Sequence, residues 1–204
     1  MILDLHTHSV KSDDGRARVD SYCQWIRKRQ VPIDGFVLTE HRQFDNESDY
    51  RLLEDTYELR ILRGSEVETT YGHVLVFGVN EDLLAAFDFT DIQLDLEKVI
   101  QEASRCGGVA VPCHPGRPTV GLCAHYASRG PVQGVQVIET LNGGSRVGED
   151  EAAQSLAAEY GYLGVGGSDS HLVSQIGRYA TRFPRAIESE EDLVTLLREG
   201  SFEA

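Results

Sequence analysis

The sequence predicts an α/β fold in which about seven strands close into a barrel, with the functional site at their carboxyl ends. Two observations support this prediction. Short apolar runs alternate with amphipathic helical segments along the 204 residues, as is typical of parallel strands joined by right-handed crossovers. Six of the seven histidines lie in five short segments at strand ends. In barrels of this kind the loops at the carboxyl ends build the active site, so the two observations agree.

The predicted strands are short apolar runs that end in glycine or polar residues and are expected to be buried. In chain order, these runs cover residues 2–5, 35–39, 60–62, 73–79, 108–111, 134–138 and 163–166. About seven such units in 204 residues favour a barrel over an open sheet.

The predicted helices lie between most of these strands. They cover residues 19–29, 94–105, 149–160 and 190–198. The first presents Tyr22 and Ile26 on one face, and the second presents Leu96 and Val99 at helical spacing before it stops at Gly107. Residues 87–92 are expected to form a loop.

Composition limits the class of protein. The chain has 19 basic and 33 acidic residues and a net charge of −14, which argues against a broad surface that neutralises the phosphates of duplex nucleic acid. A small anionic substrate remains compatible with this charge. There is no apolar stretch of the length that spans a membrane and no signal peptide pattern. We therefore expect one cytoplasmic domain over residues 1–204, without a membrane partner.

The four cysteines form no C-x-x-C pair and are expected to be reduced thiols. Cys113 is next to His114 in the sequence. Because adjacent strand residues point to opposite faces, we expect Cys113 to pack behind His114 if that histidine faces the site.

Histidines and carboxylates share the strand ends in a pattern that suits a metal site. His6 and His8 are two residues apart and so share a strand face. Asp169 and His171 repeat this spacing, and Glu66 ends an apolar run, with Glu68 as its competitor on the same face. Imidazole mixed with carboxylate is typical of a catalytic site with an open coordination position. Such a site activates water for hydrolysis.

Five motifs in order resemble those of the polymerase and histidinol phosphatase (PHP) family. They are Asp4-Leu5-His6-Thr7-His8-Ser9, Leu38-Thr39-Glu40-His41, Gly64-Ser65-Glu66, His114-Pro115 and Gly167-Ser168-Asp169-Ser170-His171. The resemblance extends over residues 2–183. It implies a distorted (β/α)7 barrel with a trinuclear site, and a phosphoesterase that uses two to three divalent ions, either manganese, zinc or iron.

The resemblance also implies a set of ligands. One ion would be held by His6, His8, Glu66 and Asp169; a second by His41 and His171 with Asp13 or Asp14; and a third by Glu66 as a bridge with His73 and His114. Spacing from His8 favours Asp13, which we take as the ligand, whereas adjacency to Gly15 favours Asp14. Glu40 stands where the family has aspartate and could orient a ligand.

Two arginines are candidates for binding the substrate phosphate. Arg117 follows His114 by three residues, and Arg178 lies in a loop after the last motif; a guanidinium fork matches phosphate oxygens. Each could instead pair with a surface carboxylate. His125 is covered by no motif and receives no role.

The sequence therefore predicts a phosphoesterase that acts on a small phosphorylated metabolite, a nucleotide or the end of an oligonucleotide. A metal-bridging hydroxide would attack phosphorus, with Glu66, Asp169 and His171 as the catalytic set. Two alternatives remain open. One is a metal-dependent amidohydrolase, since the same hydroxide can attack a carbonyl, and the other is a non-catalytic metal-binding regulatory domain.

Overall fold

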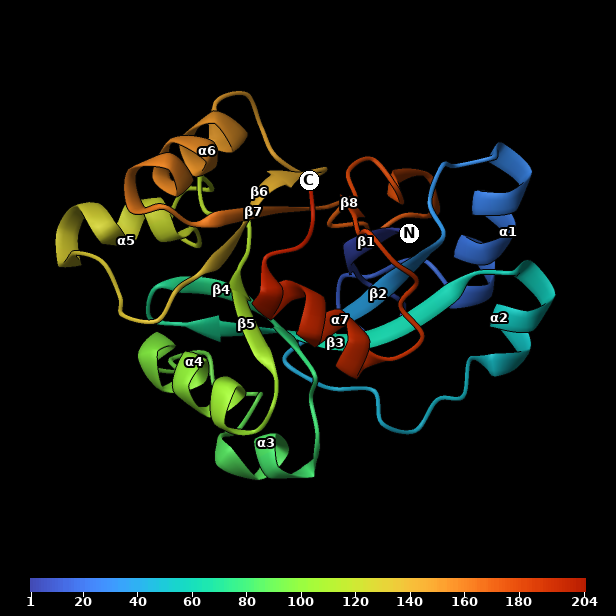
Figure 1. Cartoon of the computed structure of the whole chain (residues 1–204), viewed down its shortest axis with the longest axis horizontal. Coiled ribbons are helices and arrows are strands. Elements are labelled where there is room, and N and C mark those ends of the chain that lie inside the picture. Colours follow the sequence, from blue (N-terminus) through green and yellow to red (C-terminus); the bar gives the residue numbers. More distant parts are fainter.

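The computed structural model describes residues 1–204, in which helices surround a curled sheet (Figure 1). The strands are β1 (Ile2–Thr7), β2 (Gly35–His41), β3 (Arg60–Thr69), β4 (Gly72–Phe77), β5 (Val109–Pro112), β6 (Val137–Asn142), β7 (Leu163–Gly167) and β8 (Thr181–Arg182). The α-helices are α1 (Val19–Arg29), α2 (Arg51–Tyr57), α3 (Glu81–Ala86), α4 (Leu96–Arg105), α5 (Leu122–Arg129), α6 (Glu149–Tyr160) and α7 (Glu190–Glu199). The seven predicted strands and four predicted helices therefore all exist, most of them with shifted ends.

Six strands form one sheet in the order β5-β4-β3-β2-β1-β8. The strands β1, β2 and β3 are parallel, but β4 pairs antiparallel with both β3 and β5. The expectation that all the predicted strands run parallel is thus wrong at β4. Its reason is local: Thr70 and Tyr71 connect β3 to β4 directly, and a connection this short can join only antiparallel strands. The amino end of β4 therefore lies at the carboxyl edge of β1 to β3.

The remaining strands, β6 and β7, form a separate parallel pair. An isolated bridge from Thr7 to Ser170 links the end of β1 to the segment after β7. The result is a mixed α/β fold with a curled sheet, and the closed (β/α)7 barrel of the sequence prediction is not confirmed.

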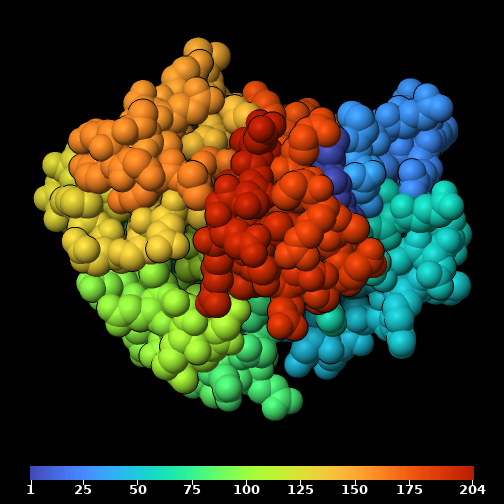
Figure 2. Space-filling model, in the orientation of Figure 1, coloured from blue at the N-terminus to red at the C-terminus, as the bar shows by residue number.

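Helix α7 packs against the inner side of the curled sheet. Its buried Leu193, Leu196 and Leu197 join one apolar cluster with residues such as Leu3 and Phe77. These strand residues lie at the amino edge of the parallel strands. In Figure 1 α7 crosses in front of the sheet, and in Figure 2 the C-terminal segment covers the middle of this face.

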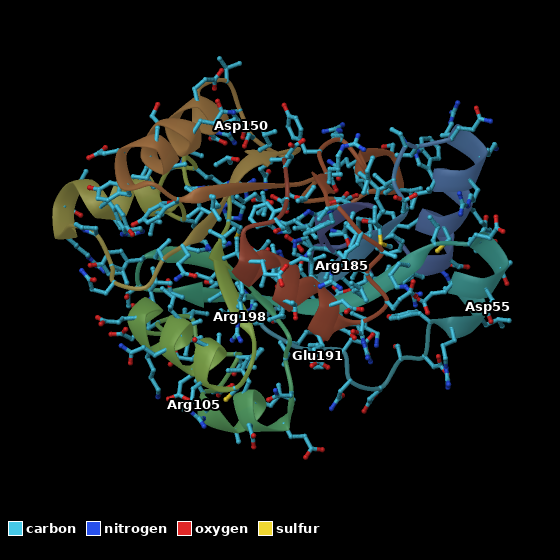
Figure 3. All side chains as sticks on the ribbon, in the orientation of Figure 1. Asp55, Arg105, Asp150, Arg185, Glu191 and Arg198 are labelled. Carbon is cyan, nitrogen blue, oxygen red and sulfur yellow. The ribbon has the colours of Figure 1, made fainter.

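The other helices cover the outer side of the sheet in two further apolar clusters. One cluster includes α3 to α6, and the other includes α1 with β1 to β3. Charged side chains such as Asp55, Arg105 and Glu191 project outward from the helices (Figure 3). No helix combines the length and the apolar character that a membrane crossing requires.

Candidate metal centre

Glu66 lies at the centre of the histidine cluster. It is near the carboxyl end of the parallel part of β3, next to His41 of β2, and is 1% exposed. Its two oxygens face different groups. Oε2 lies 2.9 Å from His6 Nε2 and 3.1 Å from His8 Nε2, whereas Oε1 lies 2.7 Å from His73 Nδ1 and 3.2 Å from His114 Nε2. One carboxylate thus faces two sets of imidazoles, the arrangement of a bridging ligand.

A register shift in β1 brings His6 to the interior. Regular alternation would place His6 on the face opposite Leu3 and Leu5, which pack inside the sheet. Between Asp4 and Thr7 the pairing with β2 shifts. Because such a bulge adds one unpaired residue, the side chains that follow it change face. His6 and His8 therefore both approach Glu66, with ring centroids 5.0 Å apart.

The second group contains His8, His41 and His171, whose ring nitrogens lie close enough to hold one ion. The carboxylate nearest to it is Asp14, with Oδ1 3.5 Å from His41 Nε2 and Oδ2 3.2 Å from His171 Nε2. Asp13 instead accepts a 2.6 Å hydrogen bond from Arg42. The choice of Asp13 over Asp14 is therefore not supported by this geometry. Both aspartates lie in one turn, and spacing alone cannot tell which side chain points inward.

The position of Cys113 differs from the one expected from the sequence. This side chain is fully buried inside the sheet, with Sγ 3.5 Å from Glu66 Oε1 and 3.4 Å from His114 Nε2. The strand β5 ends at Pro112, and His114 has a φ of 34°, so the alternation of an extended strand does not continue through these residues. Both side chains consequently reach the same site.

Glu68, the competitor of Glu66, pairs with Arg42 at 2.7 Å.

Two further carboxylates orient the imidazoles from behind. Glu139 of β6 lies 2.9 Å from His6 Nδ1 and accepts a 2.7 Å hydrogen bond from the His114 backbone N–H. Glu40 accepts a 2.6 Å hydrogen bond from the Ser12 hydroxyl, which in turn lies 3.4 Å from His8 Nδ1. In both cases the partner at Nδ1 leaves Nε2 facing the centre. Such outer contacts fix the tautomer and orientation of metal-binding histidines.

Burial and charge shift the protonation of the cluster in opposing directions. Burial tends to lower the pKa of His6, but Glu139, Asp169 and Glu66 outweigh it and raise this pKa well above its usual value. The pKa of His8 rises to about 9 because Asp169 and Glu66 likewise outweigh its burial. Although burial opposes the change, the imidazoles hold the pKa of Glu66 well below its usual value. The carboxylates therefore attract positive charge to this site.

The residues fit divalent cations. Among the buried side chains, His8 Nε2 and His114 Nδ1 have no hydrogen-bond partner, and an unpaired buried polar atom is costly unless something satisfies it. Neutral imidazole and carboxylate are common ligands of zinc, iron and manganese. His8, His6, Glu66 and Asp169 place their ligand atoms within 4.8 Å of one another. Divalent ions would supply the positive charge and the missing partner of His8 Nε2 together.

A cleft of about 580 Å³ opens beside this cluster. Its lining includes Asp14, Asp169 and His171, together with the arginines Arg16, Arg117 and Arg146. Arg117 donates a 2.7 Å hydrogen bond to Asp169 Oδ2, so this guanidinium reaches the edge of the candidate metal centre.

Two further residues discussed in the sequence analysis are Arg178, a candidate for binding phosphate, and His125, which received no role. Arg178 donates to the Gly143 carbonyl at 3.2 Å and is not among the residues that line the cleft. His125 contacts the Thr119 carbonyl from α5, outside the cluster. Sequence reasoning missed Arg16 and Arg146. A signal for Arg16 was available, because it directly follows Gly15 in the loop that carries Asp14.

Comparison with known proteins agrees with the motifs. Residues 149–202 match the family model described as PHP-associated. An uncharacterized protein of Methanocaldococcus jannaschii is 24% identical over 126 residues, which are 58% of this chain and 70% of that protein. The family match includes the last of the five motifs, Gly167 to His171, and its description agrees with the resemblance to the PHP family.

Solved structures share the fold. PsfC from Pseudomonas syringae superposes with a TM-score of 0.70 at 19% identity, covering 95% of this chain and 87% of PsfC. A putative metal-dependent phosphoesterase from Bifidobacterium adolescentis has a TM-score of 0.61 at 18% identity, covering 97% of this chain and 96% of that one. These similarities establish the mixed α/β architecture.

A third similar structure is a lesion-specific endonuclease from Pyrococcus furiosus, with a TM-score of 0.68 at 15% identity. The match covers 98% of this chain but only 56% of the endonuclease. The fold is thus also found in an enzyme that acts on DNA. The expectation that this chain has no surface for duplex nucleic acid gains no support from the fold and rests on charge alone.

Proposed function

From the resemblance to the PHP family, we propose that this chain is a metal-dependent phosphoesterase that hydrolyses a small phosphorylated metabolite or a nucleotide. The observation that carries the proposal is the position of Glu66, whose two oxygens each face a different set of imidazoles. A carboxylate shared in this way suits ions held side by side. Such ions clamp the attacking and leaving oxygens of a phosphoryl transfer.

The chain offers ligands for two to three divalent ions of manganese, zinc or iron. Glu66 Oε2, His6, His8 and Asp169 form one set, and His41 and His171 form an adjacent set with Asp14 at its edge. Glu66 Oε1 with His73 and His114 forms the third. When bound, the ions would lower the pKa of water towards neutrality and polarise the phosphoryl group.

The chain's own cationic residues bind the substrate. Arg117 is half-buried at the cleft, next to Asp169, and its guanidinium carries more donors than the two contacts it makes to Asp169 and Asn142. Arg16 and Arg146 are exposed on the same lining. Three guanidinium groups around one opening favour an anion with several oxygens. This favours a phosphoester over the uncharged amide of an amidohydrolase substrate.

The size and charge of the site favour a small substrate. A cleft of about 580 Å³ accommodates a phosphorylated metabolite or a nucleotide. The net charge of −14 opposes binding of long nucleic acids outside that cleft. The end of an oligonucleotide remains compatible with both properties.

The first experiment combines elemental analysis with a phosphoester screen of the full chain. The panel contains histidinol phosphate, nucleoside monophosphates, 3',5'-bisphosphates, a short single-stranded oligonucleotide and a DNA duplex with an abasic site. We expect bound metal and phosphate release from a small substrate. A chain that binds metal but hydrolyses none of these compounds would contradict the proposal and support a regulatory domain. Cleavage of the duplex alone would show that the substrate class is wrong.

Arginine variants test the cleft. Arg16→Ala and Arg146→Ala are expected to raise KM for the best phosphoester by about tenfold each, as the loss of a charge-assisted hydrogen bond predicts. Arg178→Ala is the matched control, because this exposed arginine lies outside the lining. If Arg178→Ala raised KM as much as the other two variants did, the cleft would not be the substrate site.

A further inference from the structure

Cys113 occupies a position at the metal centre that none of the five motifs assigns. Its thiol is fully buried and directly follows the last residue of β5. It contacts Glu66 Oε1 and His114 Nε2, two atoms of the third set of ligands. Cys113, His114, Glu66 and His6 together place their ligand atoms within 4.8 Å of one another.

The distances among these atoms match a tetrahedral zinc site. Zinc bonds of about 2.3 Å to sulfur and about 2.0–2.2 Å to nitrogen and oxygen give tetrahedral edges of about 3.6 Å from sulfur to either atom and about 3.4 Å from nitrogen to oxygen. In the structure, Cys113 Sγ lies 3.4 Å from His114 Nε2 and 3.5 Å from Glu66 Oε1, and Nε2 lies 3.2 Å from Oε1. Three edges of a coordination tetrahedron are therefore already present.

One feature of the surroundings is independent of the thiol and indicates a ligand. His8 Nε2, which faces the shared carboxylate of Glu66, is buried without a hydrogen-bond partner, so the cluster is not satisfied by the protein alone. His114 also has a left-handed backbone conformation with a φ of 34°. For a residue other than glycine this conformation is uncommon. Here it directs the imidazole and the thiol to the same point.

We infer that Cys113 is a thiolate ligand of the ion held by Glu66 Oε1 and His114. The inference rests on the metal centre of the proposed function and adds to it a choice of metal. Thiolate is a soft ligand that favours zinc, whereas oxygen ligands suit manganese. We therefore expect zinc or iron at this position. The other two positions can accept manganese at the same time. Binding of the ion releases the thiol proton to solvent.

The competing role for Cys113 is structural. Its S–H would then donate a weak hydrogen bond to Glu66 while the side chain packs with the apolar cluster that also contains Val111. In that role the sulfur never bonds to a metal. The two roles differ in a spectroscopic property that does not depend on turnover.

Cobalt substitution separates the two roles. The full chain is loaded with Co²⁺, and its absorption is recorded in the visible region, where the bound ion shows ligand-field bands, and in the near ultraviolet, where only a thiolate ligand gives an intense charge-transfer band. We expect both in the native chain. Cys113→Ser should lose the near-ultraviolet band and keep the visible bands. It should also bind a smaller share of zinc from an equimolar mixture of zinc and manganese.

The controls use the other cysteines and the fold. Cys123→Ser removes a half-buried thiol outside the cluster, which donates to the Ala152 carbonyl, and should keep the charge-transfer band. Cys113→Ala should behave as Cys113→Ser does, and thermal unfolding checks that both variants fold. Visible bands without a charge-transfer band in the native chain would overturn the inference but leave the metal centre intact. A chain that binds no cobalt would overturn the inference and the proposed metal dependence together.

Discussion

The two ends of the interior of the curled sheet are equally buried but are built from opposite kinds of residue. Beneath α7, residues such as Leu3, Phe77 and Leu196 are at most 1% exposed and belong to one apolar cluster. At the carboxyl edge, His6 and Glu66 are buried to the same degree among further imidazoles and carboxylates. The apolar end needs no partner beyond its own packing, whereas buried imidazole nitrogens at the carboxyl edge have no hydrogen-bond partner. Stability should therefore come from one end and ion binding from the other.

The same strands supply both ends. On β2, Val37 belongs to the apolar cluster and His41 to the metal centre, and on β3 the corresponding residues are Leu62 and Glu66. A few residues along one strand thus separate the two environments. This close connection makes the comparison testable, because a substitution at one end should leave the other nearly unchanged.

The largest expected effect comes from Glu66→Gln, which removes the shared carboxylate from the polar end. Loss of partners that only orient a ligand weakens metal binding or activity by about 10–100-fold. Loss of a shared ligand should therefore reduce phosphoester turnover by more than about a hundredfold. It should also remove most of the stabilisation by metal, which is about 2.7 kcal/mol at a metal concentration 100 times Kd. Turnover assays and chemical unfolding with and without metal measure both.

Glu68→Gln is the control for this variant. Glu68 lies two residues further along β3, is paired with Arg42 and lies outside the imidazole groups. It should keep turnover and the stabilisation by metal. If Glu68→Gln proved as damaging as Glu66→Gln, the assignment of Glu66 as the bridging ligand would be wrong.

At the apolar end, Leu196→Ala should affect stability alone. Leu196 is 1% exposed in the cluster beneath α7, and truncation of a buried leucine to alanine costs about 2–5 kcal/mol. The free energy of unfolding should fall by this amount, while metal content and kcat per folded molecule stay within about twofold of the native values. Loss of metal from the folded variant would show that the two ends are coupled.

Asp14→Asn tests the exposed rim of the polar end, where the effect should be smaller. Asp14 lies within 3.5 Å of both His41 and His171 but is exposed to solvent. We expect about tenfold weaker binding of one ion, as for a partner that water can partly replace. Titration of the protein with metal in a calorimeter measures this affinity. Asp13→Asn is the matched control and should bind metal normally, since Asp13 pairs with Arg42; the reverse result would restore Asp13 as the ligand.

The elements that sequence predicts well are those with a strong pattern. The ends of α1 and α6 agree with the predicted segments 19–29 and 149–160, because apolar spacing and flanking residues define both helices. The structure also brings all six histidines of the five segments together around Glu66, either directly or through a shared imidazole group. Residue type and motif order indicated this grouping, although His6 reaches it through the register shift in β1 and His73 through the antiparallel direction of β4.

The parts that the sequence did not predict depend on departures from regular backbone. The alternation rule placed Cys113 behind His114, but the strand ends before both residues and His114 takes a positive φ. The antiparallel direction of β4 follows from the short connection between β3 and β4. The pattern of apolar runs does not reveal this connection. Arg146 enters the cleft through a loop whose path no pattern describes. A single sequence records none of these conformations.

Asp45 should have the smallest effect on metal binding and is a reference for the comparison, because it is a buried carboxylate that the protein satisfies by itself. It accepts hydrogen bonds from the Tyr50 hydroxyl at 2.7 Å and the Ser48 backbone N–H at 3.1 Å, and it pairs with Lys11 at 2.6 Å. Burial alone would raise its pKa, but these partners outweigh burial and lower the pKa from 3.8 to about 2.

Asp45→Asn should therefore destabilise the fold by about 1–2 kcal/mol at pH 7, as expected for hydrogen bonds to a charged group beside a partly exposed lysine. Because the pKa of Asp45 is lower in the folded than in the unfolded chain, its contribution is complete above about pH 4 and is lost as the pH falls towards 2. Urea unfolding of both proteins between pH 7 and pH 2 should show their difference shrinking over that range, with metal binding at pH 7 unchanged. A difference that persisted at pH 2 would mean that packing, and not the charge, gives Asp45 its role.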